Sequence, residues 1–330
     1  MKLPTLDFAQ SFHGNANDDS AQFVLQAFRD PGFLFIRNIP GFQPEKLFQW
    51  TTWFFDTLPA SEREKIRPKR SKDLEIPLEY RGFIPAQEKA ESSYKDLTEI
   101  GPLETSRQDE FILLDANRWP DWQESRQASA EFKQFMQNYY KLCMQVGNHL
   151  LRLLAQATSR DAEEWVAKVN PPNLATLRLI KYPQRNGAVP KSLMAGGQRL
   201  LCASHRDTAI ITLLAIFDQP GLQIYHNGRY HDIETQEKGL IINAGKLFMP
   251  WIKNGVQATE HRVLDVGRDR YTVAFFFEPN WDVEVEAPKL DGSAGVERMQ
   301  YGRFLMESFK WYFEHNDLIP HLKQKGYVSN

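Results

Sequence analysis

The sequence is short of cysteine, of long apolar runs and of excess charge of either sign. Its 330 residues include two cysteines, Cys143 and Cys202, which are too few for a disulfide framework and fit a reducing compartment. No stretch approaches the roughly 18 apolar residues of a membrane span, and residues 1–4 lack the apolar run of a signal peptide. We therefore expect a cytoplasmic protein with no membrane partner.

The balance of charge also limits the possible partners. A formal net charge of −2 gives no general attraction to nucleic acid or to anionic lipid. Hydrophobic residues make up 42% and charged residues 25% of the chain, which is ordinary for a soluble globular protein with a substantial core. We expect no nucleic-acid partner.

Neither an internal repeat nor a flexible linker divides the chain, so we expect one domain over residues 1–330. The first part, about 1–173, is rich in helical patterns, and the longest covers residues 127–156 with apolar side chains three and four apart. Short apolar runs broken by glycines follow over about 174–280, as a small barrel of strands would require. A last helical pattern, over about 296–315, can cap that barrel.

Two histidines and an aspartate in the second half of the chain indicate a metal site. His205 and Asp207 stand two residues apart, which puts their side chains on one face of an extended chain, and His261 comes from a later strand. Two histidines and one carboxylate with open positions are the ligands of non-heme Fe(II) oxygenases. The pair alone leaves a plainer interpretation open, in which Asp207 caps a turn and His205 packs or faces solvent.

A second pattern, Arg270-Tyr271-Thr272, indicates an anion site. Arg270 and Thr272 share one face of a strand, and a guanidinium fork with a hydroxyl suits a buried carboxylate. Arg262 and Arg268 compete for this role. Only Arg270 has a hydroxyl-bearing residue two positions further on.

Several motifs carry a resemblance to a known family. In chain order they are His205-Arg206-Asp207, Pro220-Gly221-Leu222-Gln223, Asn243-Ala244-Gly245, His261-Arg262-Val263, Arg270-Tyr271-Thr272 and Phe277-Glu278-Pro279. Weaker matches extend toward the N-terminus, among them Arg81-Gly82-Phe83 and Tyr182-Pro183. In these motifs the chain resembles the isopenicillin N synthase-like group of Fe(II)/2-oxoglutarate-dependent oxygenases over most of its length.

The resemblance implies an α+β fold with a double-stranded β-helix, the jelly-roll core of cupin-like proteins, buttressed by N-terminal and C-terminal helices. It implies that Fe(II) is bound by three ligands and that 2-oxoglutarate and O2 are cosubstrates. The ligands would be His205, Asp207 and His261. The far carboxylate of 2-oxoglutarate would lie against Arg270 and Thr272, with help from Tyr182.

Two positions depart from the family pattern. Ile180 stands where many members have an asparagine that contacts the cosubstrate, and Lys246 stands where an aspartate commonly follows the glycine. The resemblance also brings the loop from Arg81 to Glu88 to the mouth of the active site. Either residue could then hold a charged group of the substrate, although each could equally form a surface ion pair. We expect Phe277 to be a further substrate contact.

The implied activity is the oxidation of an unactivated C–H bond of a small-molecule metabolite by a monomer, with release of succinate and CO2. Hydroxylation, desaturation and ring formation all fit, as in secondary metabolism. One alternative is an Fe(II) oxidase that needs no 2-oxoglutarate, like isopenicillin N synthase or aminocyclopropane carboxylate oxidase. More distant alternatives are a non-catalytic barrel that binds a ligand and a zinc hydrolase. Hydrolysis would need a general base, and we expect Glu260, the adjacent candidate, to point away from the metal.

Overall fold

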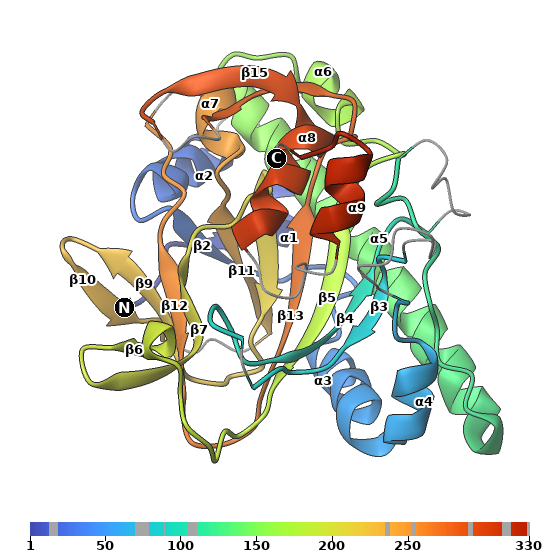
Figure 1. Cartoon of the computed structure of the whole chain (residues 1–330). Coiled ribbons are helices and arrows are strands. Elements are labelled where there is room, and N and C mark those ends of the chain that lie inside the picture. The colour runs from blue at the N-terminus through green and yellow to red at the C-terminus, as the bar shows by residue number, and fades with distance from the viewer. Residues whose placement is uncertain are drawn as a thin grey trace.

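The computed structural model describes residues 1–12, 19–69, 79–88, 90–103, 111–234, 238–252, 255–289, 293–311 and 318–328. Two curled, mainly antiparallel sheets form the core of the described part, and helices cover the outer face of the larger sheet (Figure 1). The predicted jelly-roll core with buttressing helices is confirmed.

The larger sheet has eight strands. Their order is β1 (Thr5–Asp7), β2 (Phe33–Arg37), β11 (Gly239–Ala244), β8 (Ile211–Ala215), β13 (Arg270–Phe277), β5 (Thr176–Tyr182), β4 (Asp96–Ile100) and β3 (Gly82–Ile84). The smaller sheet has the order β10 (Arg229–Asp232), β9 (Leu222–His226), β12 (His261–Leu264), β7 (Gln198–His205) and β6 (Met194–Ala195). The strands β14 (Glu284–Pro288) and β15 (Val296–Gln300) form a separate hairpin.

The tight turn between β9 and β10 follows from its sequence. Asn227 and Gly228 both have positive φ, 50° and 81°, which an Asn-Gly pair adopts at little cost. The hairpin pairs Arg229 with His226 and Tyr230 with Tyr225. It therefore extends the smaller sheet beside the strand that begins at His261.

The helices lie mostly in the first half of the chain. They are α1 (Phe8–Phe12), α2 (Ser20–Arg29), α3 (Pro44–Thr52), α4 (Ala60–Lys65), α5 (Arg126–Ala157), α6 (Ala162–Ala167), α7 (Phe248–Ile252), α8 (Tyr301–Ser308) and α9 (Ile319–Gln324). Short irregular helices occupy Trp53–Thr57, Gln123–Ser125, Lys191–Leu193 and Phe309–Trp311. Among these described elements, no helix combines the length and apolar character needed to cross a membrane.

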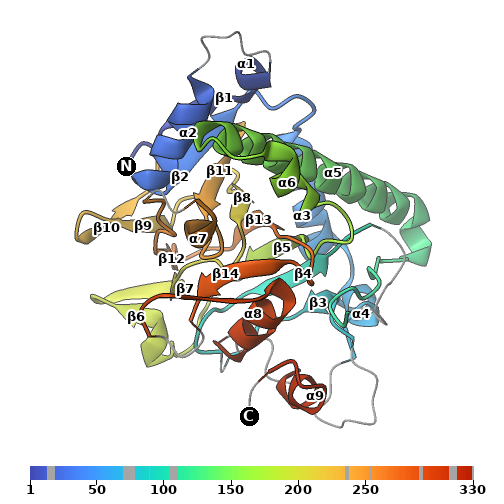
Figure 2. The ribbon, with the colours of Figure 1, turned by 90° about the horizontal axis from the view of Figure 1, so that it is seen from above.

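Helix α5 packs across the outside of the larger sheet (Figure 2). Its apolar side chains recur every three or four residues and are buried, as the pattern over 127–156 predicts. The rings of Tyr140 and Phe275 lie 5.0 Å apart edge to face. At Gly147 a Cβ atom would come within 2.6 Å of the Phe277 ring, so the helix can approach β13 closely only because this residue lacks a side chain. The outward residues of β13 thus belong to the core under α5.

The C-terminal helix is shorter than the prediction over 296–315. Residues Val296–Gln300 form β15, because Val285 and Met299 pair across the hairpin with β14 and both are buried. The helical segment begins at Tyr301, and residues 312–317 lie outside the described part. Helix α8 lies beside the β14–β15 hairpin (Figure 2).

Candidate metal centre and adjoining cavity

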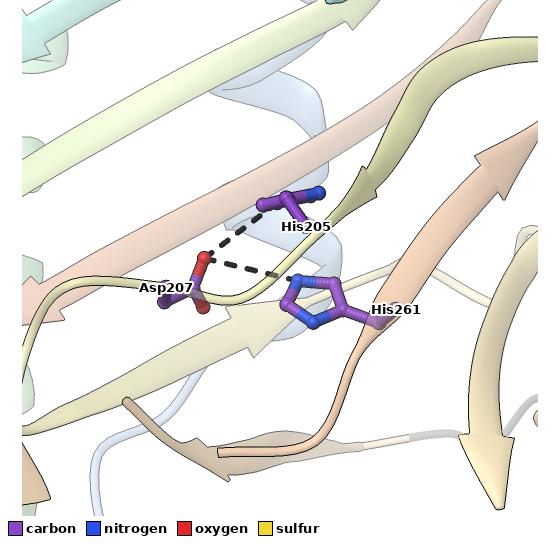
Figure 3. Close-up of side chains that lie close together, drawn as sticks. All are labelled: His205, Asp207 and His261. Carbon is purple, nitrogen blue, oxygen red and sulfur yellow. Dashed lines mark ion pairs between the residues drawn. The ribbon is translucent and has the colours of Figure 1, made fainter. Parts of the chain in front are cut away.

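Three predicted ligands meet where the smaller sheet ends. His205 is the last residue of β7, His261 is the first of β12, and the antiparallel register places them directly opposite one another. Asp207 follows β7 by two residues and turns back toward both rings (Figure 3). The Oδ1 atom of Asp207 lies 3.6 Å from Nε2 of His205 and 3.8 Å from Nε2 of His261. One atom from each residue therefore faces a common point, with all three within 4.8 Å of one another.

Backbone carbonyls orient both imidazoles. Nδ1 of His205 lies 2.9 Å from the Ala203 carbonyl oxygen, and Nδ1 of His261 lies 3.2 Å from that of Thr259. Since a carbonyl can only accept, each Nδ1 carries the hydrogen and each Nε2 keeps its lone pair. Both histidines are thus held in the tautomer that presents Nε2 to a metal ion.

The carboxylate of Asp207 is oriented by the larger sheet. Its Oδ2 accepts hydrogen bonds from Thr212 Oγ1 at 2.7 Å and Asn243 Nδ2 at 2.8 Å. These two residues pair directly across β8 and β11, so their side chains reach the carboxylate together. Oδ1 is left to face the histidines.

The charges of the three groups also suit a cation. Burial by itself would raise the pKa of Asp207, but His261, His205, Thr212 and Asn243 favour its ionised form and lower the pKa overall. Burial lowers the pKa of His261 to about 4, with His205 adding to the effect, so this imidazole is neutral at physiological pH. Two imidazoles and one carboxylate on one side of a common point fit a non-heme Fe(II) ion.

Arg270 is buried between the sheets and incompletely paired. Its Nε donates to the Pro220 carbonyl at 2.9 Å, whereas Nη2 is buried with no hydrogen-bond partner among the described residues. Gly221, at φ +107°, brings that backbone close to the guanidinium. Tyr182 lies opposite Arg270 across β5 and β13, with its ring centre 5.7 Å from the guanidinium carbon. A buried guanidinium with an unused donor suits an anion such as a carboxylate.

Thr272 lies on the same inner face as Arg270, as its spacing predicts, but its hydroxyl already has an acceptor. Oγ1 donates to the Ala215 carbonyl oxygen at 2.8 Å. A hydroxyl has a single hydrogen, so Thr272 could donate to a bound carboxylate only by giving up this hydrogen bond.

A cavity of about 380 Å³ opens beside the three ligands. His205 and Asp207 form part of its wall at one end, together with Ser204, Arg206, Lys246 and Glu260. The wall also includes Leu305 of α8 together with Arg81, Arg178, Phe276 and Glu278, and Glu278 lies close to Arg81 and Arg178. These five residues define the end of the cavity under α8. The cavity is large enough for a small molecule.

Two family models together match most of the chain. The 2OG-Fe(II) oxygenase superfamily matches residues 132–279, and the N-terminal model of non-haem dioxygenases in morphine synthesis matches residues 3–122. The chain belongs to the Fe(II)/2-oxoglutarate-dependent oxygenases. It is an oxidoreductase, with Fe(II) as cofactor and 2-oxoglutarate as cosubstrate.

This oxygenase is similar to several named proteins. It is 29% identical to the 2-oxoglutarate-Fe(II) type oxidoreductase ppzD of Metarhizium rileyi, over 84% of this chain and 81% of that protein. It is 25% identical to the isopenicillin N synthase of Penicillium chrysogenum, over 92% and 93%. A solved structure of a full-length Neurospora crassa protein in complex with alpha-KG and 5-formyluracil superposes with a TM-score of 0.73 at 24% identity, covering 92% of this chain and 94% of that one. That likeness shows the fold.

The structure separates the three predicted substrate contacts of this oxygenase. Arg81 lines the cavity. Glu88 does not: its carboxylate lies 3.3 Å from Nη2 of Arg185 and accepts a hydrogen bond from Tyr94, which is the ion-pair alternative. The prediction for Phe277 is wrong, because Phe277 points outward against Gly147 of α5. Side chains alternate along β13, so its neighbours Phe276 and Glu278 face the cavity.

Glu260 also differs from expectation, because it lies in the cavity wall. It precedes the first residue of β12, so the alternation of a strand does not govern its direction. Hydrogen bonds from Ser204 and Tyr230 lower the pKa of Glu260 despite some burial, and Arg206 lies 3.4 Å away. Its carboxylate is thus ionised and already paired.

Sequence reasoning missed Arg178, Phe276 and Glu278 as cavity residues. Arg178 and Phe276 share the inner face with Tyr182 and Arg270, and Glu278 continues that face just beyond β13. Every second residue of a strand faces the same side, so counting in steps of two from Arg270 could have predicted that Phe276 and Glu278 face the cavity. Lys246, singled out only as a departure, also lines the cavity, while its backbone N–H donates to the Asp207 carbonyl.

Proposed function

We propose that this oxygenase oxidises an unactivated C–H bond of a small-molecule metabolite and releases succinate and CO2. The observation that carries the proposal is the convergence of two oriented imidazoles and one carboxylate on a point beside a 380 Å³ cavity. When bound, Fe(II) and 2-oxoglutarate supply the oxidising chemistry with O2. The chain binds, orients and shields the reacting groups.

In this proposal, His205, Asp207 and His261 hold the metal. The Nδ1 hydrogen bonds to Ala203 and Thr259 fix both rings, and Thr212 with Asn243 fix the carboxylate. Removal of such supporting partners commonly weakens metal binding about 10–100-fold. The ligands are therefore set before the metal arrives.

Arg270 would bind the far carboxylate of 2-oxoglutarate through its unpaired Nη2, with Tyr182 beside it. Burial lowers the pKa of Arg270, which makes an anionic partner valuable at this position. Thr272 would support the carboxylate only after its hydroxyl leaves Ala215. Arg81 would contact the substrate in the adjoining cavity, whereas Glu88 has no such role.

A second candidate is oxidation without 2-oxoglutarate, as in isopenicillin N synthase. Two observations support this candidate. The chain is similar to that enzyme over 92% of its length, and Ile180 packs in an apolar cluster at a position where many family members have an asparagine. Hydrolysis has less support, because a general base works best with a pKa near neutral and that of Glu260 is lowered.

One titration tests the proposal and separates the candidates. Under anaerobic conditions, 2-oxoglutarate is added to the Fe(II) protein while the metal-to-ligand charge-transfer band is recorded, and succinate is then measured after O2 is admitted. We expect the charge-transfer band to grow to saturation as 2-oxoglutarate is added, and succinate to form once O2 is admitted. A saturable iron site without the band would support the oxidase, and absence of iron binding would overturn the metal centre itself.

A further inference from the structure

The end of the cavity under α8 holds charged groups that the metal centre does not use. Arg81, Arg178 and Glu278 all line this end, and Arg81 and Glu278 expose only 1% and 5% of their surface. They come from separate segments: Arg81 from just before β3, Arg178 from β5, and Glu278 from just after β13. A charged side chain is seldom buried so fully unless it has a partner.

Arg178 has its partner within the protein. Its Nε donates to Oε1 of Glu99 at 3.0 Å, and Nη2 donates to the same oxygen. The two residues pair directly across β4 and β5, so the ion pair belongs to the sheet. The charges of Arg178 and Glu99 thus largely cancel.

Arg81 is not matched in this way. Nη2 donates to the Leu113 carbonyl at 2.9 Å, but Nε and Nη1 have no hydrogen-bond partner among the described residues. The backbone is shaped around the guanidinium, since a Cβ atom at Gly101 would fall 1.8 Å from its Cζ. The fold therefore holds a rigid cation here with donors unused.

Glu278 is the unmatched acid at the same end of the cavity. Among the described residues, no ion pair reaches its carboxylate, although Arg178 and Arg81 are near enough to favour its charge. Burial raises the pKa of Glu278 to about 8 and outweighs the Tyr301 hydroxyl, Arg178 and Arg81, while Glu99 adds to the rise. The carboxyl is therefore largely protonated at neutral pH, and a cation bound beside it would favour its ionised form.

We propose that this end of the cavity binds the zwitterionic head group of an α-amino acid, with the substrate carboxylate at Arg81 and its ammonium at Glu278. The inference rests on the proposed function, because it takes the cavity as the place where the oxidised molecule binds. A simple anion would leave Glu278 without a partner. A simple cation would bind close to the guanidinium groups of Arg81 and Arg178, which repel it.

The position of the bound head group determines how far the side chain of the bound amino acid extends toward the metal. Phe276 is the inner-face residue of β13 that precedes Glu278, and it pairs with Thr212, whose hydroxyl holds Asp207. Two residues along a strand advance roughly 7 Å. An amino acid anchored at Glu278 would therefore extend its side chain past Phe276 toward the metal, with one of its carbons as the target of oxidation.

Equilibrium binding tests the head group apart from turnover. The standard L-amino acids are titrated by calorimetry into the protein loaded with Mn(II), which replaces Fe(II), and 2-oxoglutarate. For each amino acid that binds, the N-acetyl form, which lacks the ammonium, and the amide, which lacks the carboxylate, are compared. We expect at least one amino acid to bind and both derivatives to bind at least about tenfold more weakly, as loss of a charge-assisted contact requires.

Matched variants assign the contacts. Glu278→Gln keeps the size of the side chain and should weaken the amino acid at least about tenfold while leaving the N-acetyl form unchanged. Arg81→Lys should weaken the amino acid but not its amide. Glu284→Gln, an exposed change on β14, should alter neither. Circular dichroism and the melting temperature show whether each variant is folded.

The pH dependence separates a zwitterion from an anion. Arg81, Arg178, Glu99 and Tyr301 lie near Glu278 and come from separate segments. The ordinary pKa values of arginine, glutamate and tyrosine side chains lie outside the range of about pH 6 to 8. An ammonium ion requires ionised Glu278, so amino-acid affinity should rise over that range. A fall would indicate an anion bound to protonated Glu278 and would overturn the proposal.

Two further results would also overturn it: equal binding of an amino acid and its N-acetyl form, or no binding by any member of the panel. Repeating the titration on metal-free protein keeps this inference distinct from the proposed function. Amino-acid binding without a charge-transfer band in the Fe(II) protein would sustain the head-group site and refute 2-oxoglutarate dependence. A charge-transfer band without amino-acid binding would support 2-oxoglutarate dependence and refute the head-group site.

Discussion

The imidazole rings of His205 and His261 lie 4.3 Å apart, although a long stretch of chain separates them. Their proximity follows from the register of β7 and β12, which pairs the two residues directly. Asp207 then needs only a turn of two residues to bring Oδ1 to 3.6 Å and 3.8 Å from the two Nε2 atoms. The metal centre is therefore a property of one strand pair and of the turn that leaves it.

Replacing either histidine should abolish iron binding. His205→Ala or His261→Ala leaves two ligands, which is too few for a facial triad, and we expect stoichiometric Fe(II) binding and turnover to be lost while the fold persists. Iron content and succinate formation measure this. His226→Ala is the matched control, because His226 pairs with Asp30 instead of facing the cavity. Full iron occupancy in either ligand variant would refute the assignment.

The hydrogen-bond partners of Asp207 should affect the affinity for Fe(II), although they do not contact the metal. Thr212→Val keeps the shape of the side chain but removes the hydrogen bond to Oδ2, and we expect Fe(II) affinity to fall about 10–100-fold. Competition with a metal chelator gives the affinity. Thr52→Val serves as the control, because the Thr52 hydroxyl donates a hydrogen bond within its own helix. Equal affinity for Thr212→Val and wild type would show that Asn243 alone orients the carboxylate.

Arg270→Lys should weaken the binding of 2-oxoglutarate and leave iron binding unchanged. Lysine keeps the charge but lacks the planar fork, and loss of a partner of a buried carboxylate costs about 2–5 kcal/mol, or roughly 30-fold to several-thousand-fold in affinity. Thr272→Val should have a smaller effect, below about tenfold, because its hydroxyl bonds to Ala215. The charge-transfer titration reports both. If neither variant weakens the band, the carboxylate binds elsewhere.

Glu278 should make stability depend on pH. Its folded-state pKa of about 8 exceeds the ordinary 4.5, so the folded protein keeps a proton that the unfolded chain releases. The resulting stabilisation is complete below about pH 4.5 and is lost as pH rises through about 8. The slope cannot exceed about 1.4 kcal/mol per pH unit, the limit for one proton.

Urea unfolding of wild type and Glu278→Gln across this range measures the effect. The free energy of unfolding of the wild type should decline relative to the variant as pH increases, because glutamine cannot ionise. Glu284→Gln, with its exposed side chain, should follow the wild type. Parallel curves for wild type and Glu278→Gln would mean that Glu278 titrates normally in the folded protein.

Local patterns in the sequence determined much of this protein. The two-residue step from Arg270 to Thr272 and the apolar stripe of α5 are periodicities of single elements, and His205 and Asp207 are near neighbours in the chain. Together with the motifs that carry the family resemblance, they were sufficient to predict the jelly-roll core, the long covering helix and the family, all of which are confirmed. The ligand and cosubstrate roles stay predictions that the experiments above can test.

Only the tertiary structure decided the substrate side of the cavity. Glu88 pairs with Arg185, and Arg81 is enclosed by Gly101 and Leu113, through contacts between segments far apart in the chain. The inward direction of Glu278 likewise depends on how β13 lies between α5 and the cavity. Periodicity predicts which residues share a face, but the partner of a buried charge depends on which distant segment packs against it.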